Sequence, residues 1–480
     1  MLGLFGTLNL ASRSLQTQMA GVEVAGQNLA NVNTPGYSRQ RVIIQSDPEI
    51  QTGIGPEGTG ASVLAIQQVV DTMLNGQIQN QASQTGYANA QQSALENAQN
   101  ALNEFLSSSS AGTGATSGST TSTGLANQIS GFFKALQAVA TTPASLPARQ
   151  AVIGAAQSLA TAFQQVSARL TTVNQGLNDS LNSQVSAANQ LLADIADLND
   201  QIANSENVSG GTANTLRDLR QQKLENLSHY LNYSSSTAAD GSVDVTTIGS
   251  QTLISGNRVV NLLKTSADPV TGQLQVWTKT FNNVLTGVSY GLTGGSLVGI
   301  VNARDGELLT LQSDLNTLAT NLISQTNTLH STGFNLQGGT GASLFTGGNA
   351  GNMAVNQAIV ADPSLLQASG TAGATGDGSV ALALAQLAAS AQPALGNQTF
   401  AASYAQSVAR LGTALNNVND QVSTQSSVAG MLATQRSSVS GVNIDEEMTN
   451  LMTFQRAYQA SAHVVTTVDQ MIQTLLAMKA

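Results

Sequence analysis

The stretch ANVNTPGYSRQRV, residues 30–42, is the first break in a regular apolar pattern. Downstream of it, VIIQSD at residues 42–47 begins a strand-like segment. The stretch concentrates turn-forming residues, a tyrosine and two arginines in a chain that is otherwise poor in charge. It is therefore either an active-site loop or a joint between two elements. Upstream, apolar side chains recur every seven residues, as on one face of a helix: Leu8, Leu15, Val22 and Leu29.

The first half of the stretch has the composition of a turn. Asn31 and Asn33 can hydrogen-bond the backbone where the helix ends. Pro35 biases Thr34 away from the helical region, and Gly36 permits a positive φ. The sequence therefore predicts that the first helix ends here and that the chain changes direction.

The second half supplies one aromatic side chain and two cations. Tyr37 offers a large anchoring face, and Arg39 and Arg41 alternate along a strand so that both lie on one side. We expect them to pair with an acidic group such as Asp445–Glu447, in the same or in a neighbouring copy of the chain. The alternative interpretation is that these residues merely close a turn.

The C-terminal segment has the strongest helical pattern of the chain. Asn443 is a typical helix cap, and Asp445, Glu446 and Glu447 place negative charge in the first turn. Together with the N-terminal row, this segment predicts two helices that pack on each other as a coiled coil. The expected seam consists of Ile444, Leu451, Tyr458, Val465 and Ile472, with Phe454, Val468 and Leu475 between them.

Between the two ends the chain alternates between helical and strand-like texture. The longest apolar row follows Ser145-Leu146-Pro147 and can be traced past Ile202, which predicts a very long helix. Residues 107–124 and 337–351 are Gly-rich and are expected to be flexible loops, while residues 368–400 fit no pattern. The only Trp, Trp277, is expected to form the core of a small β domain rather than a binding contact.

These patterns predict an elongated, mainly α protein with an inserted antiparallel β domain. The expected parts are an N-terminal coiled-coil helix at 1–35, a strand, loop and linker at 36–85, a rod-like helical part at 86–230, the β insert at 231–296, a second rod-like part with a Gly/Ala-rich segment at 297–436, and a C-terminal coiled-coil helix at 437–480.

Composition excludes several classes of function. Charged residues make up 9% of the chain, the net charge is −10, and the 17 lysines and arginines form no run, so no nucleic-acid partner is expected. No apolar run reaches the length of about 20 residues that a membrane span requires. The N-terminus lacks the pattern of a cleaved secretory signal, and the absence of cysteine excludes disulfides and thiolate metal sites.

No arrangement of residues predicts an enzyme, a cofactor or a metal site. The three histidines, His229, His330 and His463, are far apart in the sequence. The segment GIGPEG at residues 53–58 matches GxGxxG, but it contains a proline and leads into a strand instead of a helix. The acidic cluster at residues 445–447 is explained by the first turn of a helix.

The two ends together resemble the bacterial flagellar axial family, which comprises rod proteins, hook protein and hook-associated proteins. The resemblance is carried by NLANVNTPGYSRQRV at residues 28–42 and by SGVNIDEEMTNLMTFQRAYQASAHVVTTVDQMIQTLL at residues 440–476. Within the family, residues 37–40 and 441–447 look most like the hook-associated members.

The resemblance implies a structural subunit that joins hook to filament and is needed for filament assembly and motility. Its terminal helices would line the axial channel and stay disordered until assembly, and its β insert would project outward. Its implied partners are a ring of its own copies, hook protein, a second hook–filament junction protein and an export chaperone. It would leave the cell through the flagellar type III export channel and lie in the extracellular part of the flagellum.

Three alternatives remain open on sequence grounds. The chain could be a hook or distal-rod protein of the same family. It could instead be a secreted adhesin that uses the β insert, or an extracellular hydrolase housed in that insert. The hydrolase reading lacks a nucleophile with a base, or a pair of carboxylates.

Overall fold

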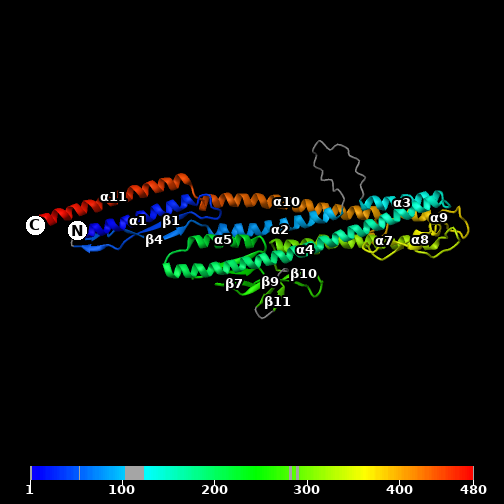
Figure 1. The fold of residues 1–480 in the computed structure, drawn as a ribbon, viewed down its shortest axis with the longest axis horizontal. Coiled ribbons are helices and arrows are strands. Elements are labelled where there is room, and N and C mark those ends of the chain that lie inside the picture. The colour runs from blue at the N-terminus through cyan, green and yellow to red at the C-terminus, as the bar shows by residue number, and fades with distance from the viewer. Residues whose placement is uncertain (1–2, 53–54, 103–123, 281–283, 288–290, 479–480) are drawn as a thin grey trace.

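The computed structural model describes residues 3–52, 55–102, 124–280, 284–287 and 291–478. The molecule is a long rod whose helices run along its longest axis, and both ends of the chain lie at the same end of the rod (Figure 1). The expected fold class, mainly α with inserted antiparallel strands, is confirmed. The principal helices are α1 (Leu4–Ala30), α2 (Thr72–Leu102), α3 (Leu125–Thr141), α4 (Leu146–Ser209), α5 (Asn214–Ser228), α6 (Ser296–Ala303), α7 (Leu309–Thr332), α8 (Gln357–Ala361), α9 (Ser379–Gln386), α10 (Phe400–Ser440) and α11 (Ile444–Ala477).

Helix α4, with 64 residues, is the central helix of the rod. It begins where the sequence predicted: the Ser145 hydroxyl accepts a hydrogen bond from the amide of Ala148, and Pro147 lies in the first turn. One side of α4 is buried along its whole length, from Val152 to Ile202, against α3, α2, α5 and the strands of the insert.

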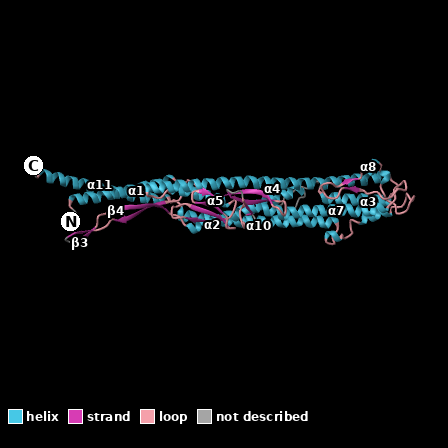
Figure 2. Ribbon diagram, turned by 90° about the horizontal axis from the view of Figure 1, so that it is seen from below, coloured by secondary structure: helices cyan, strands magenta, loops and turns pink. Residues whose placement is uncertain are grey.

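The strands form small antiparallel sheets. They are β1 (Gln40–Ser46), β2 (Ile50–Thr52), β3 (Gly55–Glu57), β4 (Ala61–Gln68), β5 (Tyr233–Thr237), β6 (Val243–Thr247), β7 (Thr252–Ser255), β8 (Arg258–Val259), β9 (Asn261–Ala267), β10 (Leu274–Thr280), β11 (Leu285–Gly287), β12 (Phe345–Thr346) and β13 (Ala354–Val355). In the first region β1 pairs with β4 and β2 with β3, and this ribbon runs beside α1 toward the termini (Figure 2). In the insert, β5-β6-β7-β8 and β11-β10-β9 form two sheets.

The insert packs on α4, and its buried residues join those of the helices in one core. Two asparagines of α4 hold the backbone of the strands. Asn189 exchanges hydrogen bonds of 2.8 and 2.9 Å with the backbone of Leu263, and Asn199 does the same with Val243 at 2.9 and 3.1 Å. The Asn189 amide thus takes the place of a neighbouring strand at the edge strand β9, and the Asn199 amide binds the first residue of β6, which lies between β5 and β7.

The expectation that Trp277 forms the core of the insert is wrong. Its neighbours in the strand, Val276 and Thr278, are fully buried, whereas Trp277 lies on the other face and is half-buried. Its ring rests on Gly287 of the adjacent strand, and its indole N–H donates to the carbonyl of Ser266. Because side chains alternate along a strand, burial of the two neighbours requires the tryptophan to face outward.

Three other segments refine the predictions. Helix α2 begins at Thr72, inside the range 36–85 where strand, loop and linker were expected, because its amide-rich sequence shows no apolar row. Residues 368–400, which fitted no pattern, contain α9 and, after it, the 3-10 turn Pro393–Leu395. Another 3-10 turn, Pro363–Leu365, comes just before this segment. Of the first Gly-rich segment, residues 107–123 lie outside the described residues.

Helices α1 and α11 lie side by side as predicted, and Phe454 of the expected seam lies in their contact (Figure 1). The close contact uses small residues of α1: a Cβ built on Gly21 would lie 2.5 Å from the Phe454 ring. Ser14 and Ser461 meet at 2.8 Å between their hydroxyl oxygens, and Val468 is the buried apolar residue of α11.

Part of the expected seam is therefore corrected. Ile444, Tyr458 and Leu475 are exposed, at 51%, 40% and 53%, whereas the face of α11 toward α1 includes residues 447, 454, 461 and 468. Small side chains on α1 let the two backbones approach, and this displaces the larger residues to the flanks. Of the other predicted positions Val468 is buried, and the rest are half-buried: Leu8, Leu15, Val22, Leu29, Leu451, Phe454, Val465 and Ile472.

Candidate functional site at the joint of the terminal helices

The stretch at residues 30–42 lies where the terminal helices meet the rod. The last turn of α1, the start of β1, the end of α10, the start of α11 and helix α5 converge there. The break is a joint, since its polar side chains are used to hold these segments together, as the following contacts show.

Asn28 is the centre of the joint, and its side chain is fully buried. Its Oδ1 accepts hydrogen bonds from the Tyr37 hydroxyl at 2.8 Å and from the Gln40 amide at 2.9 Å. Its Nδ2 donates to the Gln40 carbonyl at 2.8 Å and to the Glu447 carboxylate at 3.1 Å. One side-chain amide therefore connects α1, the turn, β1 and α11.

The turn itself is built as its composition predicts. The side chain of Asn31 donates to the Gln27 carbonyl at 3.0 Å and accepts from the Thr34 hydroxyl at 3.2 Å. Gly36 has a φ of +80°, a conformation that favours glycine, and the turn closes through a hydrogen bond from the Tyr37 amide to the Thr34 carbonyl.

The ion pair expected between Arg39 and the acidic cluster is present. The Nη1 of Arg39 lies 2.8 Å from the Oε2 of Glu446, in the same chain. The backbone of Arg39 is held as well: its amide donates to the Ser440 carbonyl, and its carbonyl accepts from the Val69 amide. Arg39 thus connects α10, α11 and the segment after β4.

The start of α11 is fixed by the predicted cap. The Asn443 side chain accepts from the amides of Asp445 at 3.0 Å and Glu446 at 3.4 Å. The three acidic residues then diverge: Glu447 points inward to Asn28 and is 4% exposed, Glu446 pairs with Arg39, and Asp445 is exposed. The negative charges meet the positive end of the helix dipole, as expected.

Burial changes the acidity of two groups at the joint. It raises the pKa of Tyr37 to about 12, with contributions from the nearby carboxylates of Asp218 and Glu447. Burial also raises the pKa of Asp218, although this carboxylate accepts a hydrogen bond from the Ser38 amide at 3.1 Å. Tyr37 therefore acts as a neutral hydrogen-bond donor, which is a structural role.

Two clefts lie beside this region. One of about 470 Å³ borders the joint and is lined by Tyr37, His229 and an ion pair in which Arg436 donates to both oxygens of Glu225 at 2.8 Å. Burial lowers the pKa of His229.

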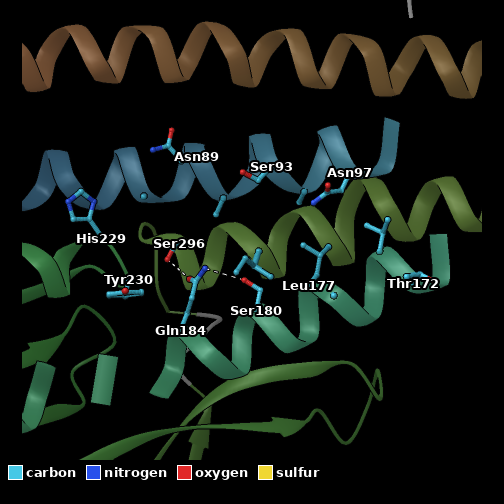
Figure 3. Close-up of a pocket in the computed structure, with 16 residues that line it drawn as sticks. Asn89, Ser93, Asn97, Thr172, Leu177, Ser180, Gln184, His229, Tyr230 and Ser296 are labelled. Atoms are coloured by element: carbon cyan, nitrogen blue, oxygen red, sulfur yellow. Dashed lines mark hydrogen bonds between the residues drawn. The ribbon is translucent and has the colours of Figure 1, made fainter. Parts of the chain in front are cut away.

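The second cleft, of about 650 Å³, lies between α2, α4 and α6 (Figure 3). Its labelled side chains are mostly amides and hydroxyls; Gln184 accepts from the Ser296 hydroxyl and donates to Ser180 at 3.3 Å. His229 lies at one end of it. Within the described residues, no cluster of His, Asp or Glu could hold a metal ion, and no helix is both long and apolar enough to cross a membrane.

The predicted site residues fall into two groups. The structure brings together Tyr37, Arg39, Asn443, Glu446 and Glu447, whereas Asn33, Pro35 and Asp445 are exposed. Arg41 is also exposed and takes no part in the pair with Glu446. The sequence analysis missed Asn28; its one local signal is a polar residue four positions after Val24, on the buried face of α1.

Known families match both the body and the C-terminal end of the chain. Residues 115–345 match the helical domain of the flagellar hook-associated protein FlgK, and residues 427–478 match the C-terminal part of flagellar basal body rod FlgEFG proteins. Flagellar hook-associated protein 1 of Bacillus subtilis is 27% identical over 532 residues, which cover 99% of this chain and 98% of that protein. The chain is therefore similar to flagellar hook-associated protein 1 along almost its whole length.

A second sequence and a solved structure are also similar to this chain. The protein from Escherichia coli is 27% identical over 374 residues, 75% of this chain and 65% of that protein. The structure of the flagellar hook junction protein FlgK from Burkholderia pseudomallei covers 76% of this chain and 100% of its own, with a TM-score of 0.65 and 18% identity, and so has the same fold. The chain is accordingly a structural component of the bacterial flagellum.

Proposed function

We propose that this protein is the adaptor that joins the flagellar hook to the filament and on which filament assembly and motility depend. The observation that carries the proposal is the joint. Asn28 and Glu447 hold α1, β1 and α11 together, and the backbone amide of Arg39 donates to the Ser440 carbonyl at the end of α10, so that the helix pair leaves the rod at a defined place. An adaptor needs such a connection because it must place one surface against each of two different neighbours.

The joint residues are proposed to act in assembly rather than in catalysis. Tyr37, Arg39, Asn443, Glu446 and Glu447 would set the direction of the terminal helices. The exposed side of the turn, with Asn33, Thr34 and Pro35, would then be free to contact a neighbouring subunit. In this arrangement residues 1–35 and 437–480 form the inner part, and the helices from α2 to α10 form the rod.

The proposed partners follow from the position at a junction. A ring of identical copies would sit on hook protein and receive a second junction protein on its other side. Before assembly the protein would be carried by an export chaperone and leave the cell through the flagellar type III channel. This role is structural and requires no catalytic residue.

Deletion of the gene tests the proposed place in the flagellum. The proposal predicts cells that make hooks without filaments and shed flagellin into the medium, seen by electron microscopy and by blotting the medium. A hook or distal-rod protein would instead leave no hook when deleted. Filaments of normal number and length on the hooks would contradict both readings.

A charge exchange at the joint tests the proposed site. Arg39→Glu places two carboxylates side by side, so a deletion strain that carries this variant is expected to swim poorly. Arg39→Glu combined with Glu446→Arg restores the opposite charges and should recover part of the swimming. Arg41→Glu is the matched control, since Arg41 is exposed and lies outside the pair. Equal motility of Arg39→Glu and the control would refute a role for the pair.

A further inference from the structure

The methionines of this protein are concentrated on the surface of one end of the molecule. Of the eight that the structure describes, Met353 alone is buried, and the other seven have exposed fractions from 41% to 81%. Apolar side chains of this size are usually buried. Three of the seven, Met448, Met452 and Met471, lie on the single helix α11, and Met478 directly follows it.

The methionines of α11 occupy two flanks of the helix, one on each side of the face that packs on α1. One flank, in the first half of the helix, consists of Ile444, Met448 and Met452, which follow one another at intervals of four residues. The other flank, in the second half, consists of Val464 and Met471, with Met478 directly after the helix. The flanks border the buried residues of α11 at Met448, next to Glu447, and at Met471, three residues after Val468.

Two flanks on opposite sides of one helix pair fit a second copy of the chain on each side. In a ring of identical subunits every copy offers one surface to its neighbour on the left and a different surface to its neighbour on the right. Because the flanks border the contact between α1 and α11, we expect neighbouring copies to cover them with their own α1 and α11. This step rests on the proposed assembly into a ring.

Methionine gives such a surface two properties. Its unbranched thioether adapts to partner surfaces of different shape. Its sulfur is also open to oxidation where solvent reaches it, and the sulfoxide that forms is polar. A leucine in the same position would provide the burial without this chemistry.

We propose that Met448, Met452 and Met471 are oxidation sites that control the entry of the free subunit into the ring. A lone pair of the thioether sulfur attacks one oxygen of hydrogen peroxide. An S–O bond forms, the O–O bond breaks, the sulfur is oxidised by two electrons, and the peroxide is reduced to water. The sulfoxide then places a strongly polar group on a flank that the neighbour must cover with apolar side chains. A methionine sulfoxide reductase that takes two electrons from thiols, which become a disulfide, removes the oxygen as water and restores the thioether and with it assembly.

The first test compares free and assembled protein. Purified full-length subunit and isolated flagella are exposed to hydrogen peroxide, and sulfoxide at each methionine is followed by peptide mass spectrometry. In the free subunit Met448, Met452 and Met471 are expected to oxidise at least about tenfold faster than the buried Met353. In flagella the three should be protected to the level of Met353. Equal rates in free and assembled protein would overturn the proposal.

The second test measures incorporation. Hooks isolated from the deletion strain are incubated with reduced or peroxide-treated subunit, and the bound subunit is quantified after the hooks are pelleted. Oxidation is expected to reduce binding about tenfold. The variant Met448→Leu/Met452→Leu/Met471→Leu should bind before and after peroxide, whereas Met73→Leu/Met431→Leu should remain sensitive.

The outcomes separate the two proposals. If reduced and oxidised subunits bind the hooks equally, the oxidation sites are refuted and the adaptor role stands. If neither binds, the adaptor role fails and the oxidation proposal fails with it. Loss of binding by the triple leucine variant before peroxide, with unchanged helix content and melting temperature, would also refute the proposal, since leucine preserves an apolar flank.

Discussion

At the scale of single residues, the joint depends on Asn28, whose amide satisfies groups from three segments. Asn28→Ala would leave the Tyr37 hydroxyl, the Gln40 amide and the Glu447 carboxylate without this partner in a buried place. An unsatisfied buried group costs about 1–3 kcal/mol, so we expect a local loss of that order.

Hydrogen exchange measures this loss where it occurs. The amides of residues 28–40 should exchange at least about tenfold faster in Asn28→Ala than in the wild type, since 1.4 kcal/mol corresponds to a factor of ten. Asn33→Ala, an exposed change in the same turn, should leave them unaltered. Unchanged protection in Asn28→Ala would mean that the turn is held without this amide.

A second residue, His330, predicts how stability depends on pH. Its ring is buried; Nδ1 contacts the Ala342 carbonyl at 2.8 Å, and Nε2 accepts from the Gln367 amide at 3.0 Å. Burial lowers the pKa of His330 to about 4, with the Arg149 cation adding to the shift. In the unfolded chain the pKa is about 6.5. The unfolded state therefore binds the proton first as the pH falls.

Stability is expected to fall as the pH drops from about 6.5 to about 4, by up to about 3 kcal/mol from this one group. Denaturant titrations at pH 7 and pH 4.5 should show a smaller decrease in the free energy of unfolding for His330→Gln than for the wild type. His463→Gln, on an exposed position of α11, is the control and should keep the full decrease. An identical decrease in all three proteins would contradict the account.

At the scale of elements, the packing of α1 on α11 depends on a glycine. A Cβ on Gly21 would approach three atoms of the Phe454 ring to 2.5–2.7 Å, so Gly21→Ala must displace this ring or push the helices apart. Gly26→Ala, with nothing within 4 Å, is the matched control and should stabilise α1 by about 0.5–1 kcal/mol.

The variants are compared in the deletion strain and in solution. Gly21→Ala should reduce swimming, and Gly21→Ala/Phe454→Ala should recover part of it because the second change removes the clash. Gly26→Ala should swim as the wild type does. If Gly21→Ala also swims normally, the close contact of α1 and α11 has no part in assembly.

Elements whose signals are local could be predicted from the sequence. The cap at Asn443 and the start of α4 at Ser145 depend on neighbouring residues, and both are found as expected. The Arg39–Glu446 pair was also expected, since few charges in the chain compete for either residue. The contact of Gly21 with Phe454 could not be predicted, because it depends on how closely two helices from opposite ends of the chain approach. The hydrogen bonds of Asn28 depend on the same tertiary arrangement.

The register of the seam shows the limit of pattern reasoning. Apolar residues at intervals of seven favoured Ile444 and Tyr458, but large apolar residues on α11 lie on both sides of the true contact. A single sequence cannot distinguish a face that packs within the subunit from one that awaits a neighbour. Making this distinction requires knowledge of the neighbouring subunit, which the sequence does not contain.

At the scale of the whole molecule, the rod and the terminal helices differ in how much they bury. The rod and the strands of the insert share one core, whereas the helix pair buries few apolar residues, among them Ala11, Val24, Ala25 and Val468. Regions with few buried contacts open more readily. Limited proteolysis of the free subunit should therefore remove α1 and α11 first and leave a fragment from about residue 70 to about residue 440. Equal resistance of both ends and the rod would contradict this difference.

The proposed function requires that this protein forms the ring between hook and filament, with its terminal helices inward. A cryo-EM map of native flagella across the hook–filament boundary tests it most directly. We expect one ring of this chain at the boundary, with α1 and α11 toward the channel. The joint around Asn28 and Arg39 should be intact, and neighbouring copies should cover the methionine flanks of α11. A boundary without this chain, or a ring with these helices on the outside, would contradict it.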